Sequence, residues 1–381
     1  MFELARTEAP ALRVSRPERI AGVDRGLRIA VFNYSLPLVG QKRGGVDRVA
    51  HDLADGLARR GHLVTVFSHD PKPPGAAYGV DVLQWRRFVD TWIGRRVTMG
   101  YLGNLLWLLP RVSEFDVLLA HGDSLLLPLK RKPFVRVMHG SARGEAVSAT
   151  SIGRSLLQAG VYLQELATAA LHRDGVVAVS ESARVPNRFI RRVIPNGVDR
   201  RTFHPGAAPR AERPTIMFVG VLSGRKRGAW LLDLFEHVIR PRVPGAELHM
   251  VCPPGPAREG VTYHIGVSDP DLAALYCRAW VYASPSTYEG FGLPYAEALA
   301  CGTPVIATPN DGSREMLSAG GGRLVDDASF APALLGLLQD EGQRRQLQRE
   351  AAARSGDHDL ERTIDAYESL LRSLVPAAAT I

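Results

Sequence analysis

One stretch decides the fold: Ser284-Pro-Ser-Thr-Tyr-Glu-Gly-Phe-Gly-Leu-Pro-Tyr-Ala-Glu-Ala-Leu-Ala-Cys-Gly-Thr-Pro-Val-Ile-Ala-Thr-Pro309. It predicts a glycine-broken loop, a helix that Cys301-Gly-Thr-Pro stops, and a strand that begins at Val305. Pro294 fits the first helical turn, where a missing N–H group costs nothing. The loop therefore ends at a helix N-terminus, whose free backbone N–H groups suit a phosphate or a sugar oxygen.

The same stretch carries two carboxylates, Glu289 in the loop and Glu297 eight residues later in the helix. That spacing alone is common, but the residues around it are specific. They resemble the retaining nucleotide-sugar glycosyltransferases of family 4, which carry a Glu-x7-Glu motif in a loop-to-helix corner. The resemblance extends over residues 28–375. It implies an α/β fold of two facing doubly wound parallel-sheet, Rossmann-like domains, the arrangement called GT-B.

The rest of the chain supports two such domains, because buried strands alternate with amphipathic helices on both sides of a Pro-, Gly- and Ala-rich segment. We predict five units. They are an N-terminal extension (1–25), an acceptor-binding domain (26–205), a linker (206–214), a donor-binding domain (215–354) and a C-terminal helix (355–381). In the resembled family this last helix crosses back onto the first domain.

A basic turn follows the first strand of the second domain, in Val219-Gly-Val-Leu-Ser-Gly-Arg-Lys-Arg-Gly228. Glycines and cations at a helix start suit a diphosphate, although a solvated basic turn is the plain alternative. The family keeps a lysine that matches Lys226 and an arginine after Gly220. The second position is Val221 here, so Arg225 and Arg227 are the candidates for that charge, and the choice between them is left open.

The resemblance implies roles for the acidic corner. Glu297 would accept hydrogen bonds from the ribose hydroxyls, and Glu289 would meet the hydroxyls of the donor sugar. The loop backbone from Gly290 through Phe291 and Gly292 to Leu293 would meet the sugar and the phosphates. Without the resemblance, Glu289 reads as a loop acid and Glu297 as an acid on a helix surface.

Two features of the first domain are candidates for the acceptor side. Gly44-Gly45 opens the first helix, so backbone N–H groups there can approach a phosphate closely, although a tight strand–helix turn is equally consistent. His139 follows a strand end, where ligands bind in α/β domains, and the family has a histidine there beside the reacting sugar. His121 ends the preceding strand and is a second, weaker candidate.

Other site chemistries find little support. Neither a P-loop nor a dinucleotide Gly-x-Gly-x-x-Gly motif is present in the sequence. Asp269-Pro-Asp271 matches the Asp-x-Asp of metal-dependent transferases, but Pro270 makes a helix cap the better interpretation. We therefore predict no metal and no cofactor, with a nucleotide-diphosphate sugar as substrate. The three cysteines show no paired spacing.

Charge is uneven along the 381 residues: residues 1–205 hold 30 Lys and Arg against 18 Asp and Glu, and the remainder is mildly acidic. A basic first half suits an anionic substrate or membrane surface. Trp85–Arg96 mixes aromatic and basic residues, so peripheral membrane contact is an open alternative to a packed helix.

No nucleic-acid-binding motif is present in the sequence. Without a spanning run or signal peptide, we expect a cytoplasmic protein, with contact at the inner membrane face left open.

The sequence thus predicts an enzyme, a retaining and metal-independent glycosyltransferase. A nucleotide-sugar epimerase of the same fold and a nucleotide-sugar-binding pseudoenzyme that serves a partner subunit are the alternatives. The departure at Val221 is the only support for the pseudoenzyme. The donor base and sugar, the acceptor (small molecule, glycan or lipid) and the oligomeric state are left open.

Overall fold

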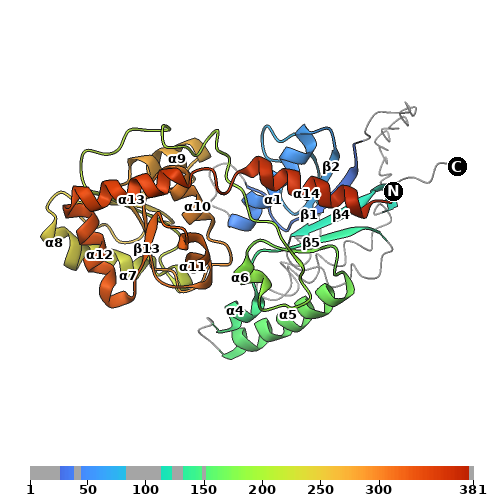
Figure 1. Ribbon diagram of the computed structural model, residues 1–381, viewed down its shortest axis with the longest axis horizontal. Coiled ribbons are helices and arrows are strands. Elements are labelled where there is room, and N and C mark those ends of the chain that lie inside the picture. Colours follow the sequence, from blue (N-terminus) through green and yellow to red (C-terminus); the bar gives the residue numbers. More distant parts are fainter. Residues whose placement is uncertain (1–25, 38–43, 83–112, 122–131, 148–151, 377–381) are drawn as a thin grey trace, which may run out of the picture.

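A computed structural model describes residues 26–37, 44–82, 113–121, 132–147 and 152–376. These residues form two parallel β-sheets, each flanked by helices and placed side by side (Figure 1). The predicted fold class, two doubly wound α/β domains, is confirmed. The predicted extension and the Trp85–Arg96 segment lie outside the described residues.

The first sheet has seven parallel strands in the order β3-β2-β1-β4-β5-β6-β7. Its strands are β1 (Arg28–Phe32), β2 (Leu63–Ser68), β3 (Gly79–Val82), β4 (Val117–His121), β5 (Phe134–Met138), β6 (Val176–Ala178) and β7 (Arg192–Val193). Central strands β4 and β5 are buried at every position, as a parallel sheet covered on both faces requires. The polar strand β3 was not predicted, because Gly79-Val-Asp-Val82 lacks an apolar run.

The helices of the first domain are α1 (Gly45–Arg59), α4 (Ala142–Val147), α5 (Ile152–Leu171) and α6 (Glu181–Arg184). Helix α1 buries an apolar side at three-and-four spacing, from Val49 to Leu57. The helix ends just before Gly61, which takes a φ of +90° that suits glycine.

The second sheet has six parallel strands in the order β10-β9-β8-β11-β12-β13. Its strands are β8 (Thr215–Val219), β9 (Glu247–Val251), β10 (Val261–His264), β11 (Val281–Ser284), β12 (Val305–Ala307) and β13 (Gly322–Leu324). The outer strands β10 and β13 were not predicted, since both are short and partly exposed. The order places β8 and β11 at the centre, so the loops after these strands lie together.

Helices cover both faces of this second sheet (Figure 1). They are α7 (Gly228–Leu234), the π-helical turn η4 (Phe235–Ile239), α8 (Arg240–Arg242), α9 (Asp269–Arg278), α10 (Leu293–Ala300), α11 (Asp311–Leu317), α12 (Asp327–Gln339) and α13 (Glu341–Ala353). Helix α7 continues directly into the π-helical turn η4, so residues 228–239 form one helical segment. Helix α10 begins with Pro294 in its first turn, as predicted.

The last helix, α14 (Leu360–Leu374), returns to the first domain and packs along α1 (Figure 1). Arg60 at the end of α1 contacts three carboxylates of α14, at 2.8 Å (Glu361), 2.6 Å (Asp365) and 3.1 Å (Glu368). Gly56 lets the helices approach, because a Cβ there would lie 2.3 Å from the Cδ1 atom of Ile364. Among the described helices, none is both long and apolar enough to cross a bilayer.

Candidate active site

A carboxylate held by two cations lies at the centre of the second domain. Glu289, in the loop after β11, is 5% exposed. Arg225 Nη1 lies 2.9 Å from its Oε2, and Lys226 Nζ contacts its Oε1. Both cations belong to the short 3-10 turn η3 (Gly224–Lys226), which follows β8. The neighbouring positions of β8 and β11 therefore join the predicted basic turn to the predicted acidic corner.

Two cations face one carboxylate in this cluster, and they set the protonation state of Glu289. Burial pushes the pKa of Glu289 upward, but Lys226 and Arg225 outweigh it and hold that pKa below the usual value. Glu289 is therefore an ionised carboxylate, which can accept hydrogen bonds from hydroxyl groups. It is not the solvated loop acid that was the plain alternative.

The two candidate cations for the charge that the family's arginine would supply at position 221 have different partners. Arg225 faces Glu289, whereas Arg227 forms a two-pronged ion pair with Asp327 at 2.8 and 2.7 Å. Arg227 also takes a left-handed backbone, with φ at 53°, which turns its side chain over Trp230. Arg225 is thus the second cation beside the carboxylate. Gly220 packs against the ring of Phe218, whose Cζ would lie 2.6 Å from a Cβ at that position.

Two helix starts without a side-chain cap lie close together at the domain boundary. Helix α10 follows Gly292, which has a φ of +85°, and α1 follows Gly44. In neither helix does a side chain cap the first N–H groups. The ends are close, because a Cβ on Gly45 would lie 3.9 Å from the Cδ2 atom of Leu293. Such paired N-termini suit an anionic or hydroxyl-bearing ligand.

Glu297 has protein partners at both of its oxygens. Its Oε1 accepts from Arg48 Nη1 of α1 at 2.7 Å, and its Oε2 accepts from the Tyr276 hydroxyl of α9 at 2.8 Å. The side chain is 3% exposed, so it is no helix-surface acid. Burial raises the pKa of Glu297, and the neighbouring Arg48 and Tyr276 offset that only in part. A ribose hydroxyl that donates to Glu297, as predicted, would bind a carboxylate that Arg48 already contacts.

Arg48 also reaches the start of α9, where its Nη2 lies 3.4 Å from Asp269 Oδ2. The N-cap of α9 is Ser268, whose hydroxyl accepts from Asp271 N at 3.3 Å, one residue before the expected cap. Pro270 lies in the first turn, as predicted. No metal-ligand cluster of His, Cys, Asp and Glu is found among the described residues.

His139 follows β5 and meets the acidic corner directly. A Cβ on Gly290 would lie 2.1 Å from the carbonyl oxygen of His139, so only glycine allows this approach. The His139 Nε2 atom lies 2.9 Å from Nδ1 of His121, and the two rings stack. Burial lowers the pKa of His139 to about 4, so its imidazole is neutral near pH 7. The two candidate histidines thus form one pair.

Tyr288 connects the acidic loop to the first domain, a role that no sequence pattern predicts. Its hydroxyl accepts from Ser141 N at 2.9 Å. Its ring fills the space beside Gly144, where a Cβ would lie 2.5 Å from Cε2. A tyrosine beside a glutamate in a loop predicts no partner in particular, so only the fold reveals it.

A second contact between the domains holds α11 against α6. Glu315 of α11 accepts from the backbone N–H groups of Glu181 (2.8 Å) and Ser182 (2.9 Å). The Ser180 hydroxyl donates to the Gly290 carbonyl at 2.6 Å. Together with Arg48 and Tyr288, these bonds hold the two domains together around the acidic loop. The side chain of Phe291 turns away and lies edge-on to His358.

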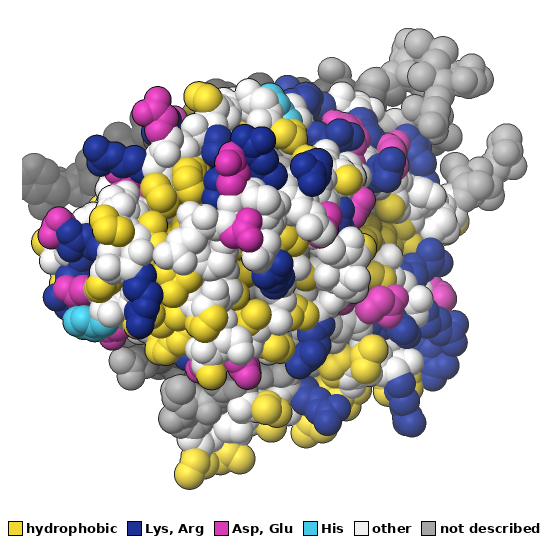
Figure 2. Space-filling model, turned by 60° about the vertical axis from the view of Figure 1, so that its left-hand side comes forward, with side chains coloured by type: hydrophobic (Ala, Val, Ile, Leu, Met, Phe, Trp, Pro, Cys, Tyr) yellow, Lys and Arg dark blue, Asp and Glu magenta, His cyan; other side chains and the backbone are white. Residues whose placement is uncertain are grey.

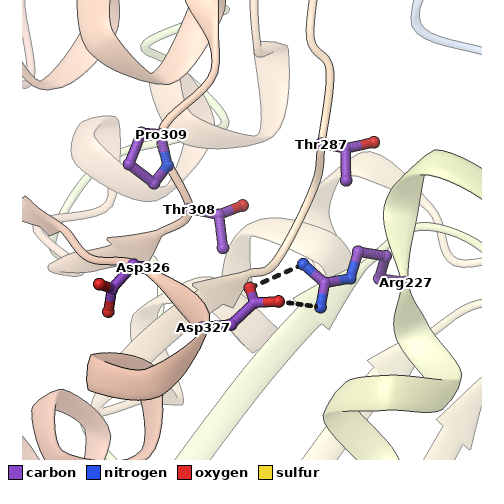
Figure 3. A pocket seen from close by; sticks show the side chains of 6 residues that line it. All are labelled: Arg227, Thr287, Thr308, Pro309, Asp326 and Asp327. Carbon is purple, nitrogen blue, oxygen red and sulfur yellow. Dashed lines mark hydrogen bonds and ion pairs between the residues drawn. The ribbon is translucent and has the colours of Figure 1, made fainter. Parts of the chain in front are cut away.

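A cavity of about 450 Å³ adjoins this site at the carboxyl ends of the second sheet (Figure 3). Its six lining residues are Arg227, Thr287, Thr308, Pro309, Asp326 and Asp327. The Arg227–Asp327 ion pair forms part of its wall (Figure 3). It shares the Thr287 loop with Glu289, but of the residues considered for donor binding only Arg227 lines it.

Comparison with known families matches both halves of the chain. Residues 43–202 match the family described as Glycosyltransferase Family 4, and residues 213–340 match Glycosyl transferases group 1. A D-inositol 3-phosphate glycosyltransferase of Xylanimonas cellulosilytica is 29% identical over 87% of this chain and 93% of its own length. An MMP alpha-(1->4)-mannosyltransferase of Mycolicibacterium hassiacum is 33% identical, over 46% of this chain and 44% of its own length.

Solved structures share the whole architecture. Sucrose-phosphate synthase of Thermosynechococcus elongatus superposes with a TM-score of 0.72 at 21% identity, over 91% of this chain and 99% of that one. Anabaena HepE in complex with UDP-glucose gives 0.68 at 17% identity, over 91% and 100%. At these identities the likeness shows the fold.

Proposed function

The chain belongs to glycosyltransferase family 4, and on that premise we propose that it is a retaining, metal-independent transferase that moves a sugar from a nucleotide-diphosphate donor to an acceptor hydroxyl. The single observation that carries the proposal is the cluster of Lys226, Arg225 and Glu289 beside the N-terminus of α10. Cations, a carboxylate and the uncapped start of α10 together match the phosphates and hydroxyls of one ligand.

In this proposal the second domain binds the donor. The diphosphate lies against Lys226, Arg225 and the N-terminus of α10, where the Leu293 N–H lies. The sugar hydroxyls meet Glu289 and the backbone from Gly290 to Leu293. Glu297 binds the ribose, with Arg48 as its neighbour. HepE, a structural neighbour, was solved with UDP-glucose, which supports a donor of this chemical class.

Catalysis follows from preorganised charge. As the bond between the anomeric carbon and the phosphate oxygen breaks, negative charge grows on the departing diphosphate. Lys226, Arg225 and the α10 N-terminus are already in place to stabilise that charge, so no metal ion or resident cofactor is needed. The acceptor oxygen bonds to the anomeric carbon on the same face, and its proton passes to a departing phosphate oxygen.

The first domain supplies the acceptor side. Neutral His139 lies against Gly290, beside the place proposed for the sugar, where it can position a hydroxyl without adding charge. Gly44 and Gly45 present the α1 N-terminus from the same side. Contacts from Arg48, Tyr288 and Ser180 hold the domains closed around the donor, which would exclude water and suppress hydrolysis.

A thermal-shift screen tests the proposal. UDP, GDP, ADP, dTDP and their sugars are added to the full chain in the presence of EDTA. One nucleotide should raise the unfolding midpoint, because a ligand of the folded state stabilises it. The shift should vanish in Lys226→Ala and persist in Arg227→Ala, whose side chain faces Asp327. No shift with any nucleotide, or a shift that requires a divalent ion, would contradict the proposal.

A further inference from the structure

Helix α5 carries its apolar side toward solvent. A stripe at helical spacing runs along its exposed side and consists of Ile152, Leu156, Gly160, Leu163, Ala167 and Leu171. Ile152 is 81% exposed and Leu163 67% exposed, and Val147 at the end of α4 continues the stripe. Figure 2 shows hydrophobic side chains gathered along the lower edge of the molecule, where Figure 1 places α4 and α5.

The opposite side of α5 is buried and holds three polar residues beside the apolar Ala169. Gln164, Glu165 and Thr168 all face the protein interior. Glu165 Oε2 accepts from Ala142 N at 3.2 Å, so α4 is fastened to this polar side. A helix at a protein–water boundary has the reverse arrangement, with apolar residues inward. The exposed side of α5 is therefore suited to an apolar phase, and not to water.

Cations lie around this stripe. Arg173 and Arg188 at the C-terminal end of α5 are exposed, and both lie over the ring of Phe189, at 5.6 and 5.0 Å. Arg143 of α4 is exposed near the other end, whereas the only acidic residue of α5 is the buried Glu165. Figure 2 shows dark blue Lys and Arg side chains beside the hydrophobic ones along this edge.

From this arrangement we propose that the exposed side of α5, together with the end of α4, docks on an anionic lipid bilayer. Apolar side chains would enter the acyl boundary while the surrounding arginines meet anionic headgroups. A second copy of the chain is the poorer partner, because two basic rims would repel one another across a symmetric contact.

The docking surface lies close to the proposed acceptor side. Helix α4 begins at Ala142, three residues after His139, and Tyr288 of the acidic loop contacts Ser141 between them. A bilayer against α4 and α5 would therefore present an amphiphilic acceptor near the site. This consequence rests on the proposed function, whereas bilayer binding itself does not.

Vesicle flotation of the full chain tests the surface. The probes are vesicles of phosphatidylcholine alone and of phosphatidylcholine mixed with phosphatidylglycerol. The chain should float with the mixed vesicles, and Leu156→Asp combined with Leu163→Asp should lower its partition by about tenfold or more. Leu63→Asp is the matched control, because Leu63 is 64% exposed on β2. It should float like the parent chain.

A second variant guards against misfolding. Arg173→Glu combined with Arg188→Glu alters exposed side chains only, and it should weaken flotation with the anionic vesicles. The proposal is overturned if the parent chain does not float, or if the aspartate variant floats equally well. A dimer in size-exclusion chromatography that the aspartate variant converts to a monomer also overturns it. The nucleotide-induced thermal shift, measured on the same variants, reports separately on the proposed function.

Discussion

Arg48 of the first domain donates to Glu297 of the second, with Nη1 and Oε1 2.7 Å apart. Both side chains are largely buried, and Arg48 also lies over the ring of Phe203, 4.9 Å from its centroid. This ion pair therefore joins the start of α1 to the middle of α10. It makes the proposed ribose carboxylate a part of the contact between the domains.

Breaking this pair from one side should be costly. Arg48→Met leaves Glu297 buried without its cation, so we expect the free energy of unfolding to fall by about 3 kcal/mol. Glu297→Gln should cost less, because the neutral amide needs no counter-charge. Urea unfolding of both single variants and of the double variant measures the coupling. Additive losses would show that the two side chains do not interact.

The second prediction concerns the cation that takes over from the family's arginine, whose position in this chain is occupied by Val221. Because Arg225 contacts Glu289 and Arg227 is bound to Asp327, Arg225→Ala should lower kcat/KM by about 100-fold. Arg227→Ala should change it by less than about threefold. Steady-state kinetics with the nucleotide sugar found in the thermal-shift screen measure both. A larger loss in Arg227→Ala would transfer the role to Arg227.

The fold could be predicted largely because its signals are local. Strands such as Phe134–Met138 are continuous apolar runs, and Gly61 and Pro294 mark helix ends by their own backbone chemistry. The polar edge strand Gly79–Val82 carries no such run. Its place depends on pairing with β2, which lies eleven residues or more earlier in the chain.

The site could be predicted only as separate motifs. The corner around Glu289 and the turn at Lys226 each have a recognisable sequence, and the fold brings them together. The partners Arg48, Tyr288 and Glu315 act across the domain boundary, between residues far apart in sequence. Such contacts depend on how the two domains meet, and a single sequence holds no periodic or spacing signal for that.

The third prediction tests the close approach of the two domains. Gly290→Ala would place a Cβ 2.1 Å from the His139 carbonyl oxygen and so force the acidic loop away from β5. We expect activity to fall by more than about 100-fold. The matched control is Gly336→Ala, inside α12, where the nearest atom would be 3.8 Å away. It should keep full activity and stabilise the protein by about 0.5 kcal/mol.

Small-angle scattering can show the cause of that loss. If Gly290→Ala separates the domains, its radius of gyration should exceed that of the parent chain and of Gly336→Ala. Full activity in Gly290→Ala would contradict the observed contact between Gly290 and His139.

The last prediction follows from the histidine pair. Burial lowers the pKa of His139 to about 4, whereas an unfolded histidine titrates near 6.5. Between these values the unfolded chain binds a proton that the native site does not, so this contribution to stability is complete above pH 6.5 and is lost as the pH falls toward 4. The substitution His139→Asn removes this pH-dependent contribution to stability, because asparagine does not titrate. The free energy of unfolding of the parent chain should therefore fall by about 1–2 kcal/mol more than that of the variant between pH 7 and pH 5.

The comparison of the two proteins cancels the contributions of other titrating groups, such as Asp52, whose pKa burial raises to about 7. Equal slopes for the parent chain and His139→Asn would show that His139 titrates alike in the folded and unfolded states.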